Sequence, residues 1–187
     1  MTFGLFRHLP RLGRKSRCLA GRRFVIDGTN VLLLHGRRKP DLRYLLTICE
    51  FIAANGGSFE CVFDANTAYL LRDYRPTQLA LYSWLLCQSA PGTCFDTVPG
   101  GTQADDRILE RAREQGADVI SNDRFRDRAQ RHRWIWKRRH GIRHANDRLL
   151  LESLDASLSV AGAGERYLRR WQRGRLTRLL ASLRRAR

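Results

Sequence analysis

The stretch Phe24-Val25-Ile26-Asp27-Gly28-Thr29-Asn30 places a short apolar run directly before a cluster of polar residues. Such a run predicts a buried strand, and the Asp-Gly pair that follows it predicts a turn. Similar runs recur along the chain, and helical spacing of apolar residues appears between them. Further strands are predicted at 59–63, 93–98 and 118–121, with helices at 41–54, 76–87 and 103–115. This alternation predicts a doubly wound α/β fold with a mostly parallel sheet.

The pattern becomes less regular after residue 123. A short basic helix is expected up to about residue 130, an aromatic strand at Trp134–Trp136, a hairpin around Gly141 and edge strands within 149–160. The two tryptophans of this segment lie among arginines, which suits stacking on nucleic-acid bases. The competing interpretation, slightly favoured by the sequence, makes them core residues on a strand.

The charge of the chain is large and unevenly distributed. Lys and Arg number 35 against 18 Asp and Glu, which gives a net charge of +17. The excess lies in residues 1–23, 124–148 and 165–187, while the segment 24–123 is acidic. Basic segments around an acidic body are expected of a protein that holds a polyanion, although the bias toward arginine can equally reflect genomic base composition.

Three regions follow from this distribution: a basic N-terminal extension (1–21), a folded domain (22–160) and a basic amphipathic helix (161–187). That helix suits an anionic membrane surface, a partner or docking onto the domain. No apolar run is long enough to span a membrane, so a cytoplasmic location is expected. The cysteines are odd in number and widely spaced, which argues against a disulfide framework or a zinc site. Cys49, Cys61 and Cys87 are expected in the core.

Carboxylates follow the predicted strands or open a predicted helix. The acids concerned are Asp27, Asp105, Asp106, Asp123 and Asp127. Ligands of such sheets collect beyond the carboxyl ends of the strands, where these side chains can converge. Clustered carboxylates must be protonated or neutralised by a cation, and all-oxygen ligation favours Mg²⁺ or Mn²⁺. Such an ion supports phosphodiester hydrolysis, because it activates water and neutralises charge on phosphate oxygens.

Each of these residues also has a purely structural interpretation. An Asp after a strand is often a helix N-cap, and acids in the first turn favour the helix dipole. Asn30 can orient water or a phosphate oxygen, or can only bond its own turn. Asp64 ends another predicted strand, and its catalytic role is left open. Ser121 and Asn122 are expected to hydrogen-bond the loop that carries Asp123.

Three blocks of the sequence, residues 24–31, 104–109 and 119–127, resemble the motifs of NYN-domain ribonucleases of the Regnase type, within the PIN-like nuclease superfamily. The resemblance covers residues 22–160 and implies a PIN-like three-layer sandwich and a metal-dependent endoribonuclease. It assigns catalytic roles to Asp27, Asn30, Asp106, Asp123 and Asp127. The ligands of Mg²⁺ or Mn²⁺ would be Asp27, Asp105, Asp106, Asp123 and Asp127. The Cys₃His zinc finger of Regnase proteins has no counterpart here.

RNA, preferably single-stranded, is the expected partner, and a homodimer is left open. Arginines near the acidic motifs are candidates for phosphate contact: Arg107, Arg124, Arg126, Arg128, Arg138, Arg139 and Arg143. The alternative function is an RNA-binding or ribosome-associated protein that uses its charge without catalysis. A haloacid-dehalogenase-type phosphatase is disfavoured because Val25 stands where its nucleophilic Asp would be. No GxxxxGK[ST] loop supports nucleotide hydrolysis.

Overall fold

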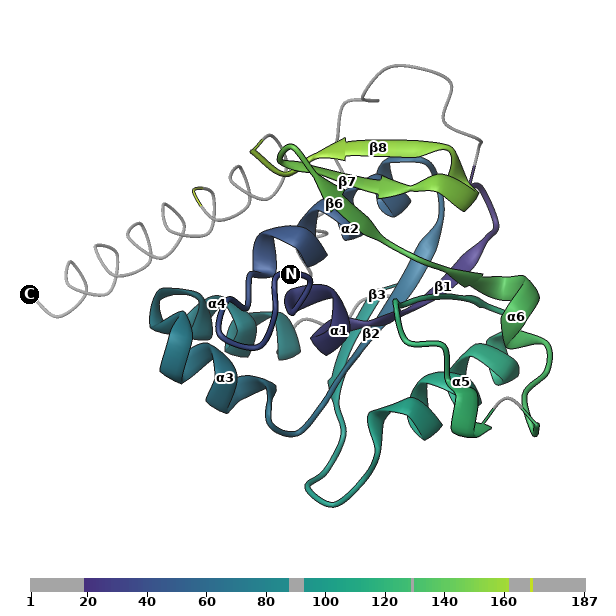
Figure 1. The fold of residues 1–187 in the computed structure, drawn as a ribbon, viewed down its shortest axis with the longest axis horizontal. Helices are drawn as coiled ribbons and strands as arrows, with labels where there is room; N and C mark the ends of the chain where they lie inside the picture. The colour runs from purple at the N-terminus through teal and green to yellow at the C-terminus, as the bar shows by residue number, and fades with distance from the viewer. Residues whose placement is uncertain (1–18, 88–92, 129, 162–168, 170–187) are drawn as a thin grey trace, which may run out of the picture.

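The central sheet has five strands, all of them parallel. A computed structural model describes residues 19–87, 93–128, 130–161 and Arg169. The strand order is β3-β2-β1-β4-β5, with β1 in the middle (Figure 1). The strands are β1 (Arg23–Asp27), β2 (Ser58–Phe63), β3 (Thr93–Thr97), β4 (Asp118–Ile120) and β5 (Arg139–His140). The predicted α/β fold with a parallel sheet is therefore confirmed.

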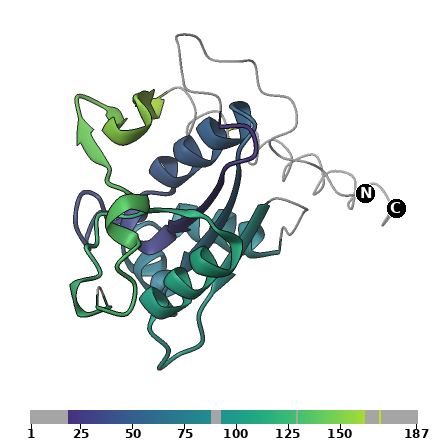
Figure 2. The same cartoon turned by 90° about the vertical axis from the view of Figure 1, so that its right-hand side faces the viewer.

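Successive residues of β1 supply the cores on both faces of the sheet. Phe24 and Ile26 belong to a large core with one set of helices, whereas Val25 belongs to a second, smaller core. This division follows from the strand geometry, in which alternate side chains point to opposite faces. Figure 2 shows helices on both sides of the sheet, so the domain has three layers.

Helices cover the sheet at the positions that the apolar spacing predicts, and three further helices are present among the described residues. The helices are α1 (Gly28–Leu32), α2 (Leu42–Ala54), α3 (Thr67–Tyr74), α4 (Pro76–Leu86), α5 (Ala104–Gln115) and α6 (Ile135–Arg138). Single 3₁₀ turns are η1 (Arg126–Arg128) and η2 (Glu152–Leu154). Neither α1 nor α3 was expected. Both are short, and each follows a strand end where the sequence indicated only a turn.

The predicted aromatic strand at Trp134–Trp136 is wrong, because this segment leads into α6 and β5 begins only at Arg139. A strand would place both tryptophans on one face, whereas residues two apart in a helix point about 200° apart. Ile135 is buried and Trp134 is partly buried against the smaller core. Trp136 is 53% exposed, so it is not a core residue.

A second sheet covers the end of α2 (Figure 1). Its antiparallel strands are β6 (Arg143–Ala145), β7 (Arg148–Leu151) and β8 (Ala156–Ser159). The hairpin turn lies at Asn146 and Asp147, both with positive φ, and not at Gly141 as predicted. Asn and Asp adopt positive φ more readily than most residues, which suits them to this turn. Buried leucines of this sheet join the larger core, so the expected edge strands are part of the domain.

Of the three cysteines expected in the core, two are buried and one is exposed. Cys49 and Cys61 are buried with their sulfurs 3.8 Å apart, as expected of core residues. Cys87 is exposed just beyond the last residue of α4, so its assignment to the core is wrong.

None of the helices in the described part of the chain is long and apolar enough to cross a membrane. The predicted basic extension up to residue 18 and nearly all of the predicted C-terminal helix lie outside the described residues.

Candidate active site

A cavity of about 320 Å³ opens at the carboxyl ends of the central strands. The residues around it come from the ends of β1, β2 and β4, from α1 and from the start of α5. Its lining consists of Asp27, Thr29, Asn30, Leu33, Leu34, Asp64, Asp105, Asn122 and Asp123. Segments far apart in the sequence thus bring four carboxylates to one place, as the strand order leads one to expect.

Asp27 is the most buried of these acids. It is the last residue of β1 and the N-cap of α1, and its Oδ1 accepts a hydrogen bond from the Asn30 N–H at 3.1 Å. Its Oδ2 accepts a second one from the Ser121 hydroxyl at 2.7 Å. The side chain therefore caps α1, as the structural interpretation expects, and it also faces the cavity.

Burial raises the pKa of Asp27 from 3.8 to about 7, and the negative charges of Asp105 and Asp64 act in the same direction. The hydrogen bonds from Ser121 and Asn30 oppose this rise, but they do not cancel it. The carboxyl group is therefore only partly ionised at neutral pH. Full ionisation would be favoured by a cation in the cavity.

Asp105 and Asp64 are the other cavity acids whose pKa values are raised. Burial raises the pKa of Asp105, and the charges of Asp123, Asp64 and Asp106 raise it further against the attraction of Arg128. Burial likewise raises the pKa of Asp64. These mutual effects identify the four cavity acids as one electrostatic cluster. Asp64, whose role the sequence left open, belongs to it.

The loop after β4 presents Asp123 to the cavity. The Ser121 hydroxyl accepts a hydrogen bond from the Asp123 N–H at 3.0 Å while it donates to Asp27. One oxygen of Asp123 accepts from the Phe125 N–H at 2.7 Å, and the Phe125 ring is buried. The predicted bonding of this loop by Ser121 is confirmed. Hydrogen bonds hold both the backbone N–H and the side chain of Asp123.

Two asparagines join α1 to the same loop. The Asn122 N–H donates to Asn30 Oδ1 at 3.0 Å, so Asn30 bonds a residue distant in sequence and not only its own turn. Asn30 Nδ2 has no hydrogen-bond partner within the described residues, and it remains available as a donor at the cavity. The Asn122 side chain donates to the Ile142 carbonyl at 2.9 Å and accepts from the Ile142 N–H at 2.7 Å. It connects the site to the segment that leads into the second sheet.

Thr29 is a site residue that the sequence reasoning did not identify. Its hydroxyl accepts a hydrogen bond from the Asp64 N–H at 2.8 Å and lies 2.8 Å from the Thr67 hydroxyl. These contacts fix the end of β2 against α1 and so position Asp64. The available signal was the hydroxyl residue next to the Asp27-Gly28 turn.

Gly28 is required by the close packing beneath Asp27. A Cβ added to Gly28 would lie 2.4 Å from an atom of the Phe63 ring. That ring is fully buried and packs edge-on against Tyr82. Only glycine allows α1 to start this close to β2, which explains the residue after Asp27.

Two acids expected in the site lie outside the cavity lining. The Asp106 side chain is 56% exposed, and its Oδ1 accepts from Arg128 Nε at 2.5 Å. Asp127 is exposed in η1. Arg128 also forms an ion pair with Asp105 at 3.1 Å and a hydrogen bond with the Gln103 side chain. Its guanidinium thus lies between the exposed acids and the cavity.

The arginines expected to contact RNA fall into two groups. Four are engaged by the protein itself: Arg128 as above, Arg107 with Asp96 at 3.7 Å, Arg143 with Glu152 at 2.7 Å, and Arg139 with the Ser121 carbonyl at 2.8 Å. The remaining three, Arg124, Arg126 and Arg138, are exposed and form no ion pair within the described part of the chain.

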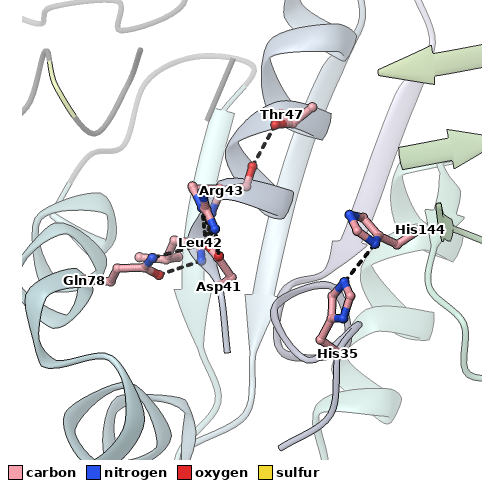
Figure 3. A network of polar contacts seen from close by, with 7 residues as sticks. All are labelled: His35, Asp41, Leu42, Arg43, Thr47, Gln78 and His144. Carbon is pink, nitrogen blue, oxygen red and sulfur yellow. Dashed lines mark hydrogen bonds and ion pairs between the residues drawn. The ribbon is translucent and has the colours of Figure 1, made fainter. Parts of the chain in front are cut away.

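A second polar network lies beside α2, away from the cavity lining (Figure 3). Asp41 caps α2 and accepts from Arg43 and Gln78. Burial alone would raise the pKa of Asp41, but the hydrogen bonds of Arg43 hold it below its usual value. His35 Nε2 lies 2.8 Å from His144 Nδ1, which joins the loop after α1 to β6. These contacts stabilise the fold around the site.

The donor set of the cavity fits a hard divalent cation. Its ligating atoms are carboxylate, amide and hydroxyl oxygens, which Mg²⁺ and Mn²⁺ prefer. Within residues 19–87, 93–128 and 130–161, no three Asp, Glu, His or Cys side chains are gathered closely enough to hold an ion by themselves. An ion in this cavity would therefore be held by one or two carboxylates and several waters, as Mg²⁺ usually is.

A sequence model of one protein family matches most of the chain. The Zc3h12a-like ribonuclease NYN domain matches residues 20–156, a range that contains every residue of the cavity. None of the curated proteins compared with the chain is similar enough to count as a match. The family match confirms the resemblance that the three motifs indicated. The chain belongs to the family of Zc3h12a-like ribonuclease NYN domains.

Proposed function

We propose that this chain is a divalent-metal-dependent endoribonuclease that cleaves single-stranded RNA in the cavity at the carboxyl ends of β1, β2 and β4. The observation that carries the proposal is the electrostatic coupling of Asp27, Asp64 and Asp105, whose pKa values are all raised. For a protein that only binds RNA, four acids around one cavity are unfavourable, because they repel phosphate.

Asp27 and Asp123 are the residues proposed to bind Mg²⁺ or Mn²⁺ directly, and Asp105 through a bound water, with Asp64 at the opposite side of the cavity. The bound ion would activate water and neutralise charge on the phosphate. Asn30 Nδ2 would donate to a phosphate oxygen, since Asn30 Oδ1 is already occupied by the Asn122 N–H. Ser121 would keep Asp27 and the Asp123 loop in a fixed relation.

Asp106 and Asp127 are proposed to act from outside the cavity. Asp106 accepts a hydrogen bond from Arg128, and the negative charge of Asp127 also attracts this arginine, so the two acids help to hold the guanidinium beside Asp105. Their contribution to catalysis would therefore be indirect, through the position and charge of Arg128.

Cleavage of an end-labelled single-stranded RNA tests the function. The wild-type chain should cut it with Mg²⁺ or Mn²⁺ and leave it intact in chelator. Asp123→Asn should reduce the cleavage rate by at least roughly 100-fold. Substitutions of residues that only support a metal ligand usually cost less than this. Asp73→Asn, in an exposed acid of α3, is the matched control and should cut normally. RNA that is bound but never cut by the wild type would favour the non-catalytic alternative.

A further inference from the structure

An exposed basic strip begins directly after Asp123 and runs to the end of α6. We define it by six cations and one aromatic residue: Arg124, Arg126, Arg131, Arg133, Lys137, Arg138 and Trp136. All seven are exposed, and none of the six cations forms an ion pair within the described residues. The positive charges of the strip therefore have no acidic partner among the described residues. Arg107, Arg128 and Arg143, in contrast, each form an ion pair.

Trp136 gives the strip an apolar surface. It is one of three large hydrophobic side chains exposed in the described part of the chain, with Tyr69 and Tyr74 of α3. An indole that is more than half exposed between Lys137 and the arginines offers a flat face for stacking. Exposed rings alternating with cations are how proteins hold unpaired nucleic-acid strands without reading sequence.

The position of the strip relative to the cavity identifies the kind of partner. Arg124 adjoins Asp123 in the chain, and α6 precedes β5, which pairs with β4 from Val119 to Ile120. Because β4 and β5 are parallel, α6 lies toward the amino end of β4, away from the cavity edge. The segment 124–138, anchored by the buried Phe125 and Ile135, connects the two places, so an RNA strand that leaves the cavity past Arg124 can follow its exposed cations. The four acids of the cavity repel phosphate, and the strip supplies the opposing attraction.

We infer that the basic strip binds the single-stranded RNA substrate outside the cavity, with Trp136 stacking on one base and the arginines contacting phosphates. This inference rests on the proposed function, because it assumes that RNA enters the cavity. It assigns binding to residues 124–138 in preference to Arg107, Arg128 and Arg143, each of which already forms an ion pair within the protein.

Binding of a fluorescent single-stranded RNA to the full chain in chelator tests the strip without cleavage. Trp136→Ala should weaken binding by roughly 5- to 140-fold, the range that stacking of one base provides. Tyr74→Ala is the matched exposed aromatic control and should leave the affinity unchanged. A duplex of the same sequence should be insensitive to Trp136→Ala, because its bases are already stacked.

The arginines are tested by the salt dependence of the same binding. Arg131→Gln with Arg133→Gln should reduce the slope of log affinity against log salt by about 1.4, since each contact to a single strand contributes roughly 0.7. The pair Arg72→Gln and Arg75→Gln on the other side of the domain removes the same charge and should not change the slope. An acidic protein as the true partner would appear as unchanged RNA binding in all strip variants, which overturns the inference.

The strip and the proposed function can fail separately. Normal cleavage and normal binding by the strip variants would refute the strip and leave the nuclease in place. Weakened binding by the strip variants, with no cleavage by the wild type in Mg²⁺ or Mn²⁺, would support the strip and refute the nuclease. Circular dichroism and melting of each variant show that the fold is kept, as expected for exposed side chains.

Discussion

Arg128 and Asp105 form an ion pair of 3.1 Å at the edge of the acidic cavity. The guanidinium is a cation already present where a divalent ion is expected, and its charge lowers the pKa of Asp105 against the effects of burial and the other acids. The pair thus reduces repulsion within the metal-free cluster. It also places a positive charge where it opposes a second cation.

Arg128→Gln should strengthen the binding of a divalent ion. Removing the competing charge should lower the Mn²⁺ concentration that half-saturates the protein severalfold, measured without RNA as a shift in melting temperature. Arg107→Gln, in a cation paired with Asp96, is the control and should not change it. An equal or higher Mn²⁺ requirement would instead indicate that Arg128 holds the acids in their ligating positions.

Asp27 should make the stability of the metal-free protein depend on pH. Its pKa rises from 3.8 to about 7 on folding, so the stabilisation from its bound proton is complete below about pH 4 and is lost as the pH rises through 7. At roughly 1.4 kcal/mol per pH unit, the loss by pH 8 is about 4 kcal/mol. For a domain of this size, that corresponds to a decrease in melting temperature on the order of 10 °C.

Asp27→Asn isolates this effect. Asn can accept from the Asn30 N–H and donate to the Ser121 hydroxyl, so both contacts persist without a charge, with the direction of the Ser121 bond reversed. In chelator, the variant should melt above the wild type at pH 8 and close to it below pH 4, where Asp27 is protonated in the folded and the unfolded chain alike. Mg²⁺ at pH 8 should raise the melting temperature of the wild type far more than that of the variant. Parallel curves for the two proteins from pH 5 to 8 would contradict the assigned pKa.

The strand ends could be predicted from sequence because each is marked locally. A buried apolar run ending in Asp27 or Asp123 indicates both the strand and the edge of the sheet at which its acid lies. Asp64 was ambiguous because Asn66 and Thr67 follow it, which also indicates a simple turn. Its place in the cavity depends on the hydrogen bond to Thr29, which is 35 residues away.

Which of Asp105 and Asp106 faces the cavity depends on the position of each residue around the axis of α5. Asp105 precedes Ile108 and Leu109 by three and four residues and so lies near the buried face of α5, while Asp106 points away. That signal was present in the sequence. The helical conformation of Trp134–Trp136 could not be predicted in the same way. Aromatic residues favour strands on average, and tertiary contacts override that preference here.

Gly28→Ala should destabilise the domain and impair cleavage together. The new methyl group would overlap the Phe63 ring, which cannot withdraw because it is buried against Tyr82. Overpacking of this kind costs about 1–3 kcal/mol, and any shift of α1 moves Asp27 and Asn30. Urea unfolding measures the loss. Gly100→Ala, where nothing lies within 4 Å of the added Cβ, should unfold like the wild type, and an equal loss in both variants would refute the packing argument.

Asn122→Ala should loosen the connection between the two sheets. It removes the acceptor of the Ile142 N–H and the donor to its carbonyl, and an unsatisfied buried group costs about 1–3 kcal/mol. The Asn122 N–H still reaches Asn30, so the cavity edge keeps its backbone contact. Hydrogen exchange should therefore accelerate in β6–β8 and remain slow in β1 and β2.

Asn66→Ala is the matched control for this exchange experiment. Asn66 is exposed at the start of α3, and its side chain makes no capping hydrogen bond, so its removal should leave exchange unchanged. Acceleration across β1 and β2 as well would mean that Asn122 supports the whole domain. Unchanged exchange in β6–β8 would show that the buried leucines of the larger core hold the second sheet in place without the Asn122 bridge.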